Sequence, residues 1–132
     1  METRKIVIKT KNAPEPLGPY SQAIVVGNMV YVSGVIGLDP KTNELVEGGV
    51  QNETTQVLLN LGAVLEAAKS SFSEILKTTI FLENMNDFAV VNEKYKNCFK
   101  NDFPARSTIQ VAKLPKNAKV EIEVIATTNN IK

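Results

Sequence analysis

The chain has 132 residues, 43% of them hydrophobic, and its fifteen basic and fourteen acidic residues leave a formal net charge of +1. This length and composition predict one compact domain over residues 1–132, and the near-neutral charge provides no overall field that would concentrate nucleic acid or anionic lipid at its surface. One cysteine and no histidine exclude an internal disulfide and the ordinary zinc sites, so we expect a reducing compartment and no metal.

The N-terminal part of the chain predicts a strand, a rigid loop and a hairpin. Residues 4–9 form the first predicted strand, and this start contains no apolar run long enough for a signal peptide or a membrane span. It indicates a cytoplasmic protein and leaves a mitochondrial or nuclear pool open. Prolines over 12–20 exclude a helix there. Residues 23–26 and 29–32 flank Gly27-Asn28, a pair that tolerates positive φ and favours a tight hairpin turn.

The middle of the chain predicts a helix and a further strand. Apolar residues recur at helical spacing from about residue 50 to 69, opposite a polar side that holds Glu53 and Asn60. A helix with one apolar side is expected to cover a sheet. Residues 75–83 return to the alternation of a strand, with Leu76 on its more apolar face.

The C-terminal part predicts a second helix and two more strands. The helix is expected to begin near Asn86, as its N-cap, and to run to about Lys100. Strands over about 106–111 and 119–127 are separated by a turn at 114–117. This order of elements predicts an α+β domain of two layers, with both helices on one face of the sheet.

The strand over 106–111 carries the most informative side chain. Pro104 places Arg106 at the start of this strand, and alternation puts Arg106, Thr108 and Gln110 on one polar face. A guanidinium matches the geometry of a carboxylate through two parallel hydrogen bonds, so Arg106 is a candidate anion-binding residue. The alternative is an arginine held in a structural ion pair.

Other polar side chains lie beside apolar stripes. Glu121 and Glu123 share one side of the last strand, either as ligand-binding groups or as solvated carboxylates. Asn92 lies on the apolar stripe of the second helix, where a buried amide needs partners from a ligand or from the backbone. Tyr20 follows a stiff Gly-Pro pair, and its ring either presents the hydroxyl to a pocket or packs as a lid. Cys98 continues the apolar stripe and is expected in the core.

With these positions assembled, the chain closely resembles the RidA/YjgF family of enamine and imine deaminases over nearly its whole length. The resemblance implies a chorismate-mutase-like α+β fold, a mixed six-stranded sheet with two helices on one face, and a homotrimer with a cleft at each subunit interface. The matching segments are Gly18-Pro19-Tyr20-Ser21-Gln22-Ala23, Tyr31-Val32-Ser33-Gly34, Asn86-Asp87-Phe88 with Val91-Asn92-Glu93-Lys94-Tyr95, Phe103-Pro104-Ala105-Arg106-Ser107, and Val111-Ala112-Lys113-Leu114-Pro115-Lys116 leading into Val120-Glu121-Ile122-Glu123.

The resemblance also implies roles for individual residues. Arg106 is expected to bind the substrate carboxylate, and Glu121 to hold the attacking water. Many relatives have cysteine where this chain has Thr108 and glutamine where it has Val35. The family cysteine acts mainly through its backbone, so Thr108 is expected to preserve activity, whereas Val35 bears on substrate preference. The implied substrate-binding residues are Tyr20, Ser33, Gly34, Asn92, Arg106 and Thr108.

The implied reaction is hydrolysis of 2-iminoacids, such as 2-iminobutanoate and 2-iminopropanoate, to 2-oxoacids and ammonia, with no cofactor and no membrane partner. Positioning with general acid or base assistance suffices, because a protonated imine is already electrophilic. Two alternatives come from the same family: an endoribonuclease or translation inhibitor acting on single-stranded RNA, and a chaperone-like trimer without chemistry. The net charge of +1 and the lack of histidine argue against RNA.

Overall fold

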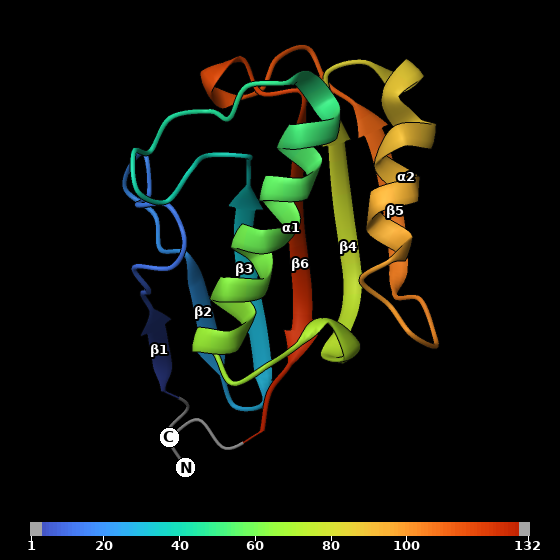
Figure 1. Cartoon of the computed structure of the whole chain (residues 1–132). Coiled ribbons are helices and arrows are strands. Elements are labelled where there is room, and N and C mark those ends of the chain that lie inside the picture. The colour runs from blue at the N-terminus through green and yellow to red at the C-terminus, as the bar shows by residue number, and fades with distance from the viewer. Residues whose placement is uncertain (1–3, 130–132) are drawn as a thin grey trace.

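The computed structural model describes residues 4–129 and consists of two layers, a six-stranded sheet and two α-helices that cross one of its faces (Figure 1). The strands lie in the order β1-β2-β3-β6-β4-β5. β4 and β5 pair in parallel and the other neighbours are antiparallel, so the sheet is mixed and the predicted fold class is confirmed. The elements are β1 (Lys5–Ile8), β2 (Ala23–Val26), β3 (Met29–Val35), α1 (Gly49–Ala67), β4 (Ile75–Leu82), α2 (Phe88–Lys96), β5 (Ala105–Gln110) and β6 (Val120–Thr127).

The core lies between the sheet and α1, and the central strand β6 contributes to it at every second residue. Val120, Ile122, Val124 and Ala126 are each at most 3% exposed. Burial of a large aliphatic side chain contributes about 1.5–3 kcal/mol, so this alternation fixes which face of β6 turns inward. The residues between them, which include Glu121, are thereby directed to the other face.

That other face is covered by no helix among residues 4–129 (Figure 1). Val7 on β1 and Tyr31 on β3 alternate with more buried neighbours and point away from the helices. They are 58% and 47% exposed. Large apolar side chains gathered on an open sheet face are typical of a surface that another molecule covers.

Two residues on the polar side of α1, opposite its apolar stripe, are buried. Glu53 is 2% exposed and Asn60 is 1% exposed. Asn60 Nδ2 donates hydrogen bonds to the carbonyl oxygens of Ile36, at 3.2 Å, and Leu38, at 2.8 Å. The Lys119 N–H donates to Glu53 Oε1 at 2.7 Å, and burial raises the pKa of Glu53. Segments distant in sequence therefore cover the polar side of α1 as well as its apolar side.

The second helix is shorter than predicted, and Asn86 is not its N-cap. A 3₁₀ turn over Met85–Asp87 precedes α2, and the Asn84 side chain accepts a hydrogen bond from the Asn86 N–H at 2.9 Å. Asn84 therefore caps this 3₁₀ turn, whereas α2 begins after Asp87 without a side-chain cap and ends at Lys96 instead of Lys100. No helix of the described chain is long and apolar enough to cross a membrane.

Leu76 is 50% exposed, although alternation placed it on the apolar face of β4. The pairing of β4 with β6 shifts register between Ile75 and Lys77, which displaces one residue of β4. From Thr78 onward the strand alternates as predicted. The bulge therefore corrects the assignment of Leu76 without changing the rest of the strand.

Candidate active site

Most of the predicted site residues fall into two groups. The first lines a pocket where β3 ends, and the second lines a pocket between α2 and the edge strand β5. We call them the carboxylate half-site and the arginine half-site. The carboxylate half-site consists of Tyr20, Ser33, Gly34 and Glu121, and the arginine half-site of Asn92 and Arg106.

The two half-sites lie on opposite faces of the sheet. On β5, Arg106 pairs with Thr78, which is 1% exposed, so the Arg106 side chain lies on the helix-covered face. On β6, Glu121 alternates with the buried Val120 and Ile122 and points to the other face. β4 separates β5 from β6, so their backbones are about 10 Å apart across the sheet. A single small substrate therefore cannot contact both charged groups within one copy of the chain.

Gly34 leaves the space that the Glu121 side chain occupies. The pairing of β3 with β6 is irregular between Val32 and Val35, and the Gly34 backbone lies directly beneath the Glu121 carboxyl group. A Cβ atom on Gly34 would lie 2.6 Å from Glu121 Cδ, which is closer than real carbon contacts allow. The position of this carboxyl group thus depends on glycine at residue 34.

The Glu121 carboxyl group is suited to exchange a proton. Burial raises its pKa above the ordinary value of 4.5, and the negative charge of Glu123 raises it further. Neither of these two effects on the pKa is a hydrogen bond. Within residues 4–129 no protein group donates a hydrogen bond to the carboxylate oxygens of Glu121. A partly buried carboxylate whose oxygens are free can accept a proton from a water molecule.

Tyr20 and Ser33 are held at the mouth of this pocket by the surrounding backbone. The Tyr20 hydroxyl accepts a hydrogen bond from the Leu17 N–H at 2.9 Å. The Ser33 hydroxyl donates to the Ser21 carbonyl oxygen at 2.6 Å. Because Tyr20 is 47% exposed, its ring borders the opening and is not packed as a buried lid.

Gln22 orders the proline-rich loop of the carboxylate half-site, a role that the sequence analysis missed. Its side chain is 8% exposed, and its Oε1 accepts a hydrogen bond from the Thr10 N–H at 2.7 Å. Its Nε2 donates to the carbonyl oxygens of Thr10, at 3.1 Å, and Pro14, at 2.9 Å. The only signal in the sequence is a glutamine next to an apolar strand, where a buried amide needs partners.

In the arginine half-site, α2 holds the guanidinium of Arg106. Arg106 Nη1 donates a hydrogen bond to Asn92 Oδ1 at 2.8 Å. The guanidinium carbon lies 5.1 Å from the centre of the Tyr95 ring and 5.4 Å from that of Phe88. No salt bridge in the described part of the chain includes Arg106, so the structural ion pair considered for it is absent there. The remaining donors of the guanidinium are available to an anionic ligand.

Tyr95 connects the guanidinium to the core, and this contact was also missed. The Tyr95 hydroxyl and Thr78 Oγ1 are hydrogen-bonded at 2.8 Å in the interior. Burial raises the pKa of Tyr95, so the phenol stays neutral. In the sequence, Tyr95 belongs to the same apolar stripe of α2 that holds Asn92. The presence of Asn92 between two aromatic residues of that stripe was the signal that the stripe also faces the polar residues of β5.

Thr108 lies on the same face of β5 as Arg106 but lines neither pocket. It pairs with Ile80, which is fully buried. Its Oγ1 is buried and has no hydrogen-bond partner among residues 4–129. The structure therefore brings together Arg106 and Asn92, as predicted, but leaves Thr108 beside this group.

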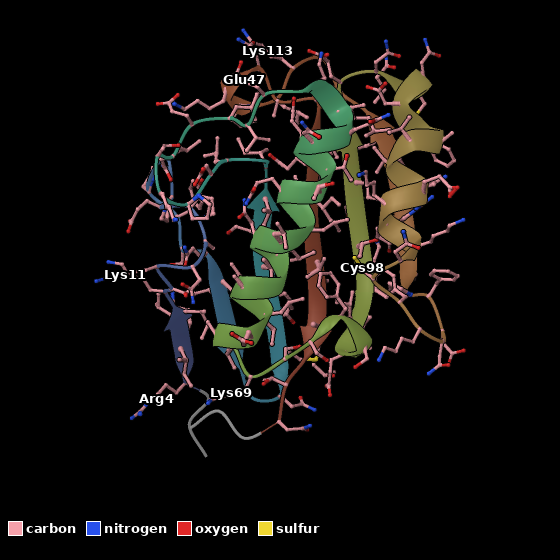
Figure 2. All side chains as sticks on the ribbon, in the orientation of Figure 1. Arg4, Lys11, Glu47, Lys69, Cys98 and Lys113 are labelled. Atoms are coloured by element: carbon pink, nitrogen blue, oxygen red, sulfur yellow. The ribbon has the colours of Figure 1, made fainter. Side chains whose placement is uncertain are left out.

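Cys98 contributes packing in this structure. It lies beside the C-terminal end of α2 (Figure 2) and packs, partly buried, against the core. Burial raises the pKa of its thiol, which disfavours the reactive thiolate. Across residues 4–129 no three acidic, cysteine or histidine side chains gather as metal ligands would.

Comparison with known proteins gives consistent matches over the whole fold. The family profile described as "Endoribonuclease L-PSP" matches residues 10–128. Proteins named 2-iminobutanoate/2-iminopropanoate deaminase are 51% identical in Dermatophagoides farinae, over 92% of this chain and 94% of the relative, and 51% identical in Homo sapiens, over 91% and 88%. A Yersinia pestis crystal structure, described as a protein of unknown function of the conserved Rid family, is 51% identical, covers 95% of this chain and 100% of its own, and has a TM-score of 0.92.

Proposed function

Because the chain belongs to the endoribonuclease L-PSP family, we propose that it is a deaminase that hydrolyses 2-iminobutanoate and 2-iminopropanoate to 2-oxoacids and ammonia. The resemblance to RidA/YjgF proteins is confirmed by these relatives. One observation carries the proposal for this chain: Arg106 is held by Asn92, Glu121 occupies the space that Gly34 leaves, and neither has an oppositely charged partner among the described residues. A small-molecule substrate, a cytoplasmic location and independence of cofactors belong to the same proposal.

The two groups divide the chemistry between them. Arg106 donates parallel hydrogen bonds to the substrate carboxylate, and Asn92 and Tyr95 keep the guanidinium in place. Glu121 accepts a proton from water while the water oxygen bonds to C2 of the iminium ion, whose C=N electrons move to nitrogen. The amino alcohol that forms receives this proton back on its nitrogen. Ammonia then leaves and takes up the proton of the hydroxyl group, which becomes the carbonyl of the 2-oxoacid. General base assistance of this kind contributes about 10²–10⁴-fold.

The separation of the half-sites is the reason to propose a homotrimer. With Arg106 and Glu121 on opposite faces of one sheet, a complete site needs the arginine half-site of one copy against the carboxylate half-site of the next. Head-to-tail contacts that close into a ring of three give three identical sites. The exposed side chains of the open sheet face, such as Tyr31, are then covered inside the ring.

The remaining predicted residues have supporting roles in this composite site. Tyr20 and Ser33 border the opening in which the substrate lies, and Gly34 gives the Glu121 carboxyl group its position. Thr108 contributes through the backbone of β5, on which Arg106 is carried.

Arg106→Ala is the test of this proposal. Removal of the guanidinium lowers hydrolysis of 2-iminobutanoate by at least about 100-fold, because the substrate is no longer oriented. Ammonia release from the imine, generated in situ by an amino-acid oxidase, is compared for wild type, Arg106→Ala and Arg106→Lys, and size-exclusion chromatography follows assembly. Arg106→Lys retains the positive charge but lacks the planar guanidinium that donates two parallel hydrogen bonds, so an intermediate rate is expected. Wild-type rates in Arg106→Ala contradict the assignment, and failure of that variant to assemble assigns Arg106 a structural role.

The endoribonuclease alternative has less support. The pocket around Glu121 is lined by no lysine or arginine that could hold a phosphate, and the arginine half-site pairs Arg106 with only one lysine, Lys96. RNA cleavage that copurifies with the protein and disappears in Arg106→Ala would favour the endoribonuclease over the deaminase. The chaperone-like trimer predicts instead that the same variant has no effect on any reaction.

A further inference from the structure

We propose that Gln22 is a positioning residue of the active site, which holds the proline-rich loop over residues 10–17 as a fixed cover beside Glu121 and keeps bulk water away from its carboxyl group. The inference rests on the proposed function and adds to it a residue that acts on the reaction through this loop. The loop is part of the site, because residues 13–17 line the same cavity as Glu121.

The loop has no backbone support of its own. The ladder between β1 and β2 ends at the pair Ile8 and Ala23. Beyond that pair, no backbone-to-backbone hydrogen bond joins residues 10–17 to another segment of the described chain. Pro14 and Pro16 restrict the loop but donate no hydrogen bond. Because ordering a segment costs conformational entropy, the loop depends on side chains that bind its backbone.

Gln22 supplies the buried part of this support. Its Oε1 accepts a hydrogen bond from the Thr10 N–H at 2.7 Å, and its Nε2 donates to the Thr10 carbonyl oxygen at 3.1 Å and to that of Pro14 at 2.9 Å. The side chain is 8% exposed, so little water competes for these hydrogen bonds. Loss of the amide would leave backbone groups of the loop unpaired unless the loop opens to water.

Two other side chains hold the loop, and both of their contacts lie at the surface. Asn43 Oδ1 accepts a hydrogen bond from the Glu15 N–H at 3.1 Å, and the Tyr20 hydroxyl accepts one from the Leu17 N–H at 2.9 Å. Exposed hydrogen bonds are weakened because water replaces either partner at little cost. Gln22 is therefore the contact whose loss is expected to release the loop.

The loop matters for Glu121 because the space beside that carboxyl group is small. The cavity has a volume of about 60 Å³, which admits only a few water molecules. Burial is the main reason that the pKa of Glu121 is raised, and the charge of Glu123 on the same strand adds to it. Glu15 and Tyr20 are the other titratable groups that line the cavity. Release of the loop admits water, so the pKa of Glu121 falls toward 4.5.

Gln22→Met is the test, because it removes the amide at nearly constant size. It lowers kcat for 2-iminobutanoate by about tenfold, since the attacking water is no longer held in a confined space. KM stays within about twofold, because the substrate carboxylate is bound by Arg106 of the neighbouring copy. The pKa of Glu121 is followed by NMR titration of carboxyl-labelled glutamate, with the signal assigned by Glu121→Gln, and it falls toward 4.5.

A control and a second variant accompany this test. Gln51→Met makes the same change at an exposed position of α1 that does not line the cavity, and it leaves kcat and the pKa of Glu121 unchanged. Asn43→Gly is the second variant if Gln22→Met does not fold. Glycine accepts the φ of 60° at Asn43 without strain, and the variant removes only a surface contact of the loop. It acts in the same direction, with kcat lower by about threefold.

The outcomes separate this inference from the proposed function. A lower pKa of Glu121 with a lower kcat at constant KM supports the inference. An unchanged pKa of Glu121 or an unchanged kcat in the folded variant overturns it, and a loss of thermal stability alone assigns Gln22 a purely structural role. Hydrolysis of no imine by the wild-type protein overturns the proposed function alone, because the titration of Glu121 needs no substrate and still decides whether Gln22 controls its hydration.

Discussion

The two half-sites hold their charges by opposite means. In the arginine half-site the charged group is surrounded: an amide oxygen, two aromatic rings and a buried tyrosine–threonine hydrogen bond fix the guanidinium. In the carboxylate half-site the charged group is given room, since a glycine lies beneath it and no protein donor within residues 4–129 bonds it. This difference fits the roles proposed for the two groups, in which Arg106 binds and orients an anion and Glu121 exchanges a proton.

Glu121→Gln is the largest test of this contrast. A glutamine keeps the shape of the side chain but cannot accept a proton from water, so kcat for imine hydrolysis falls by about 10²–10⁴-fold. Because Arg106 still binds the carboxylate, KM for the imine changes little. Steady-state kinetics with 2-iminobutanoate measures both quantities, and a raised KM with an unchanged kcat would show that Glu121 binds substrate and performs no proton transfer.

Gly34→Ala tests whether the room beneath Glu121 matters. The added methyl group would lie 2.6 Å from Glu121 Cδ, so the carboxyl group must move. A displacement of about 1 Å at a reacting group lowers kcat by up to about 100-fold. Gly18→Ala is the control, since its added Cβ comes no closer than 3.9 Å to Tyr20. Full activity in Gly34→Ala would mean that the carboxyl position is not critical.

Tyr95→Phe tests the support of the arginine half-site with a smaller expected effect. It removes the hydrogen bond to Thr78 but keeps the ring beside Arg106, so the guanidinium gains freedom and KM rises by about threefold to fivefold at constant kcat. Thr78→Val should give the same increase. The double variant should recover part of the stability lost in Tyr95→Phe, because it leaves no buried hydroxyl unpaired. An unchanged KM would assign the support of Arg106 to the ring alone.

The raised pKa of Glu121 predicts a modest dependence of stability on pH. Because the pKa is raised mainly by burial, the folded state binds the proton more tightly than the unfolded chain, and stability is lost as the pH rises from 4.5 through the raised pKa. Glu121→Gln removes this loss and raises the melting temperature at pH 7 by about 2–4 °C, with no gain at pH 4. Glu53, whose pKa is also raised, is present in both proteins, so its contribution to the pH dependence of stability cancels in the comparison. Thermal melts at the two pH values check the sign, and an equal gain at both contradicts it.

The sequence predicted the elements because each depends on local patterns. Alternation along 119–127 and the helical spacing over 50–69 are properties of neighbouring residues, and both elements are present as β6 and α1. Burial of Glu53 and Asn60 was not predictable in this way, since it depends on Lys119 and on the segment at 36–38. A hydrophobic pattern describes one element and contains no information about a loop that returns to cover it.

The site residues were predictable in kind but not in arrangement. Alternation showed that Arg106 and Thr108 share a face of one strand and that Glu121 shares a face with Glu123 in another. It could not show whether these two faces are the same face of the sheet, because that depends on the pairing of both strands with β4. The structure places the residues on opposite faces, and this finding is the basis of the proposed site shared between copies.

The most direct test of the shared site mixes two inactive variants. Arg106→Ala and Glu121→Gln subunits are refolded together in equal amounts, and imine hydrolysis is compared with that of each variant alone and of wild type. If every site takes its arginine from one copy and its carboxylate from the next, random assembly restores about a quarter of the sites, with a corresponding rate. If each copy contains a complete site, no mixed assembly has both groups intact, and a rate no higher than that of the separate variants would contradict the account.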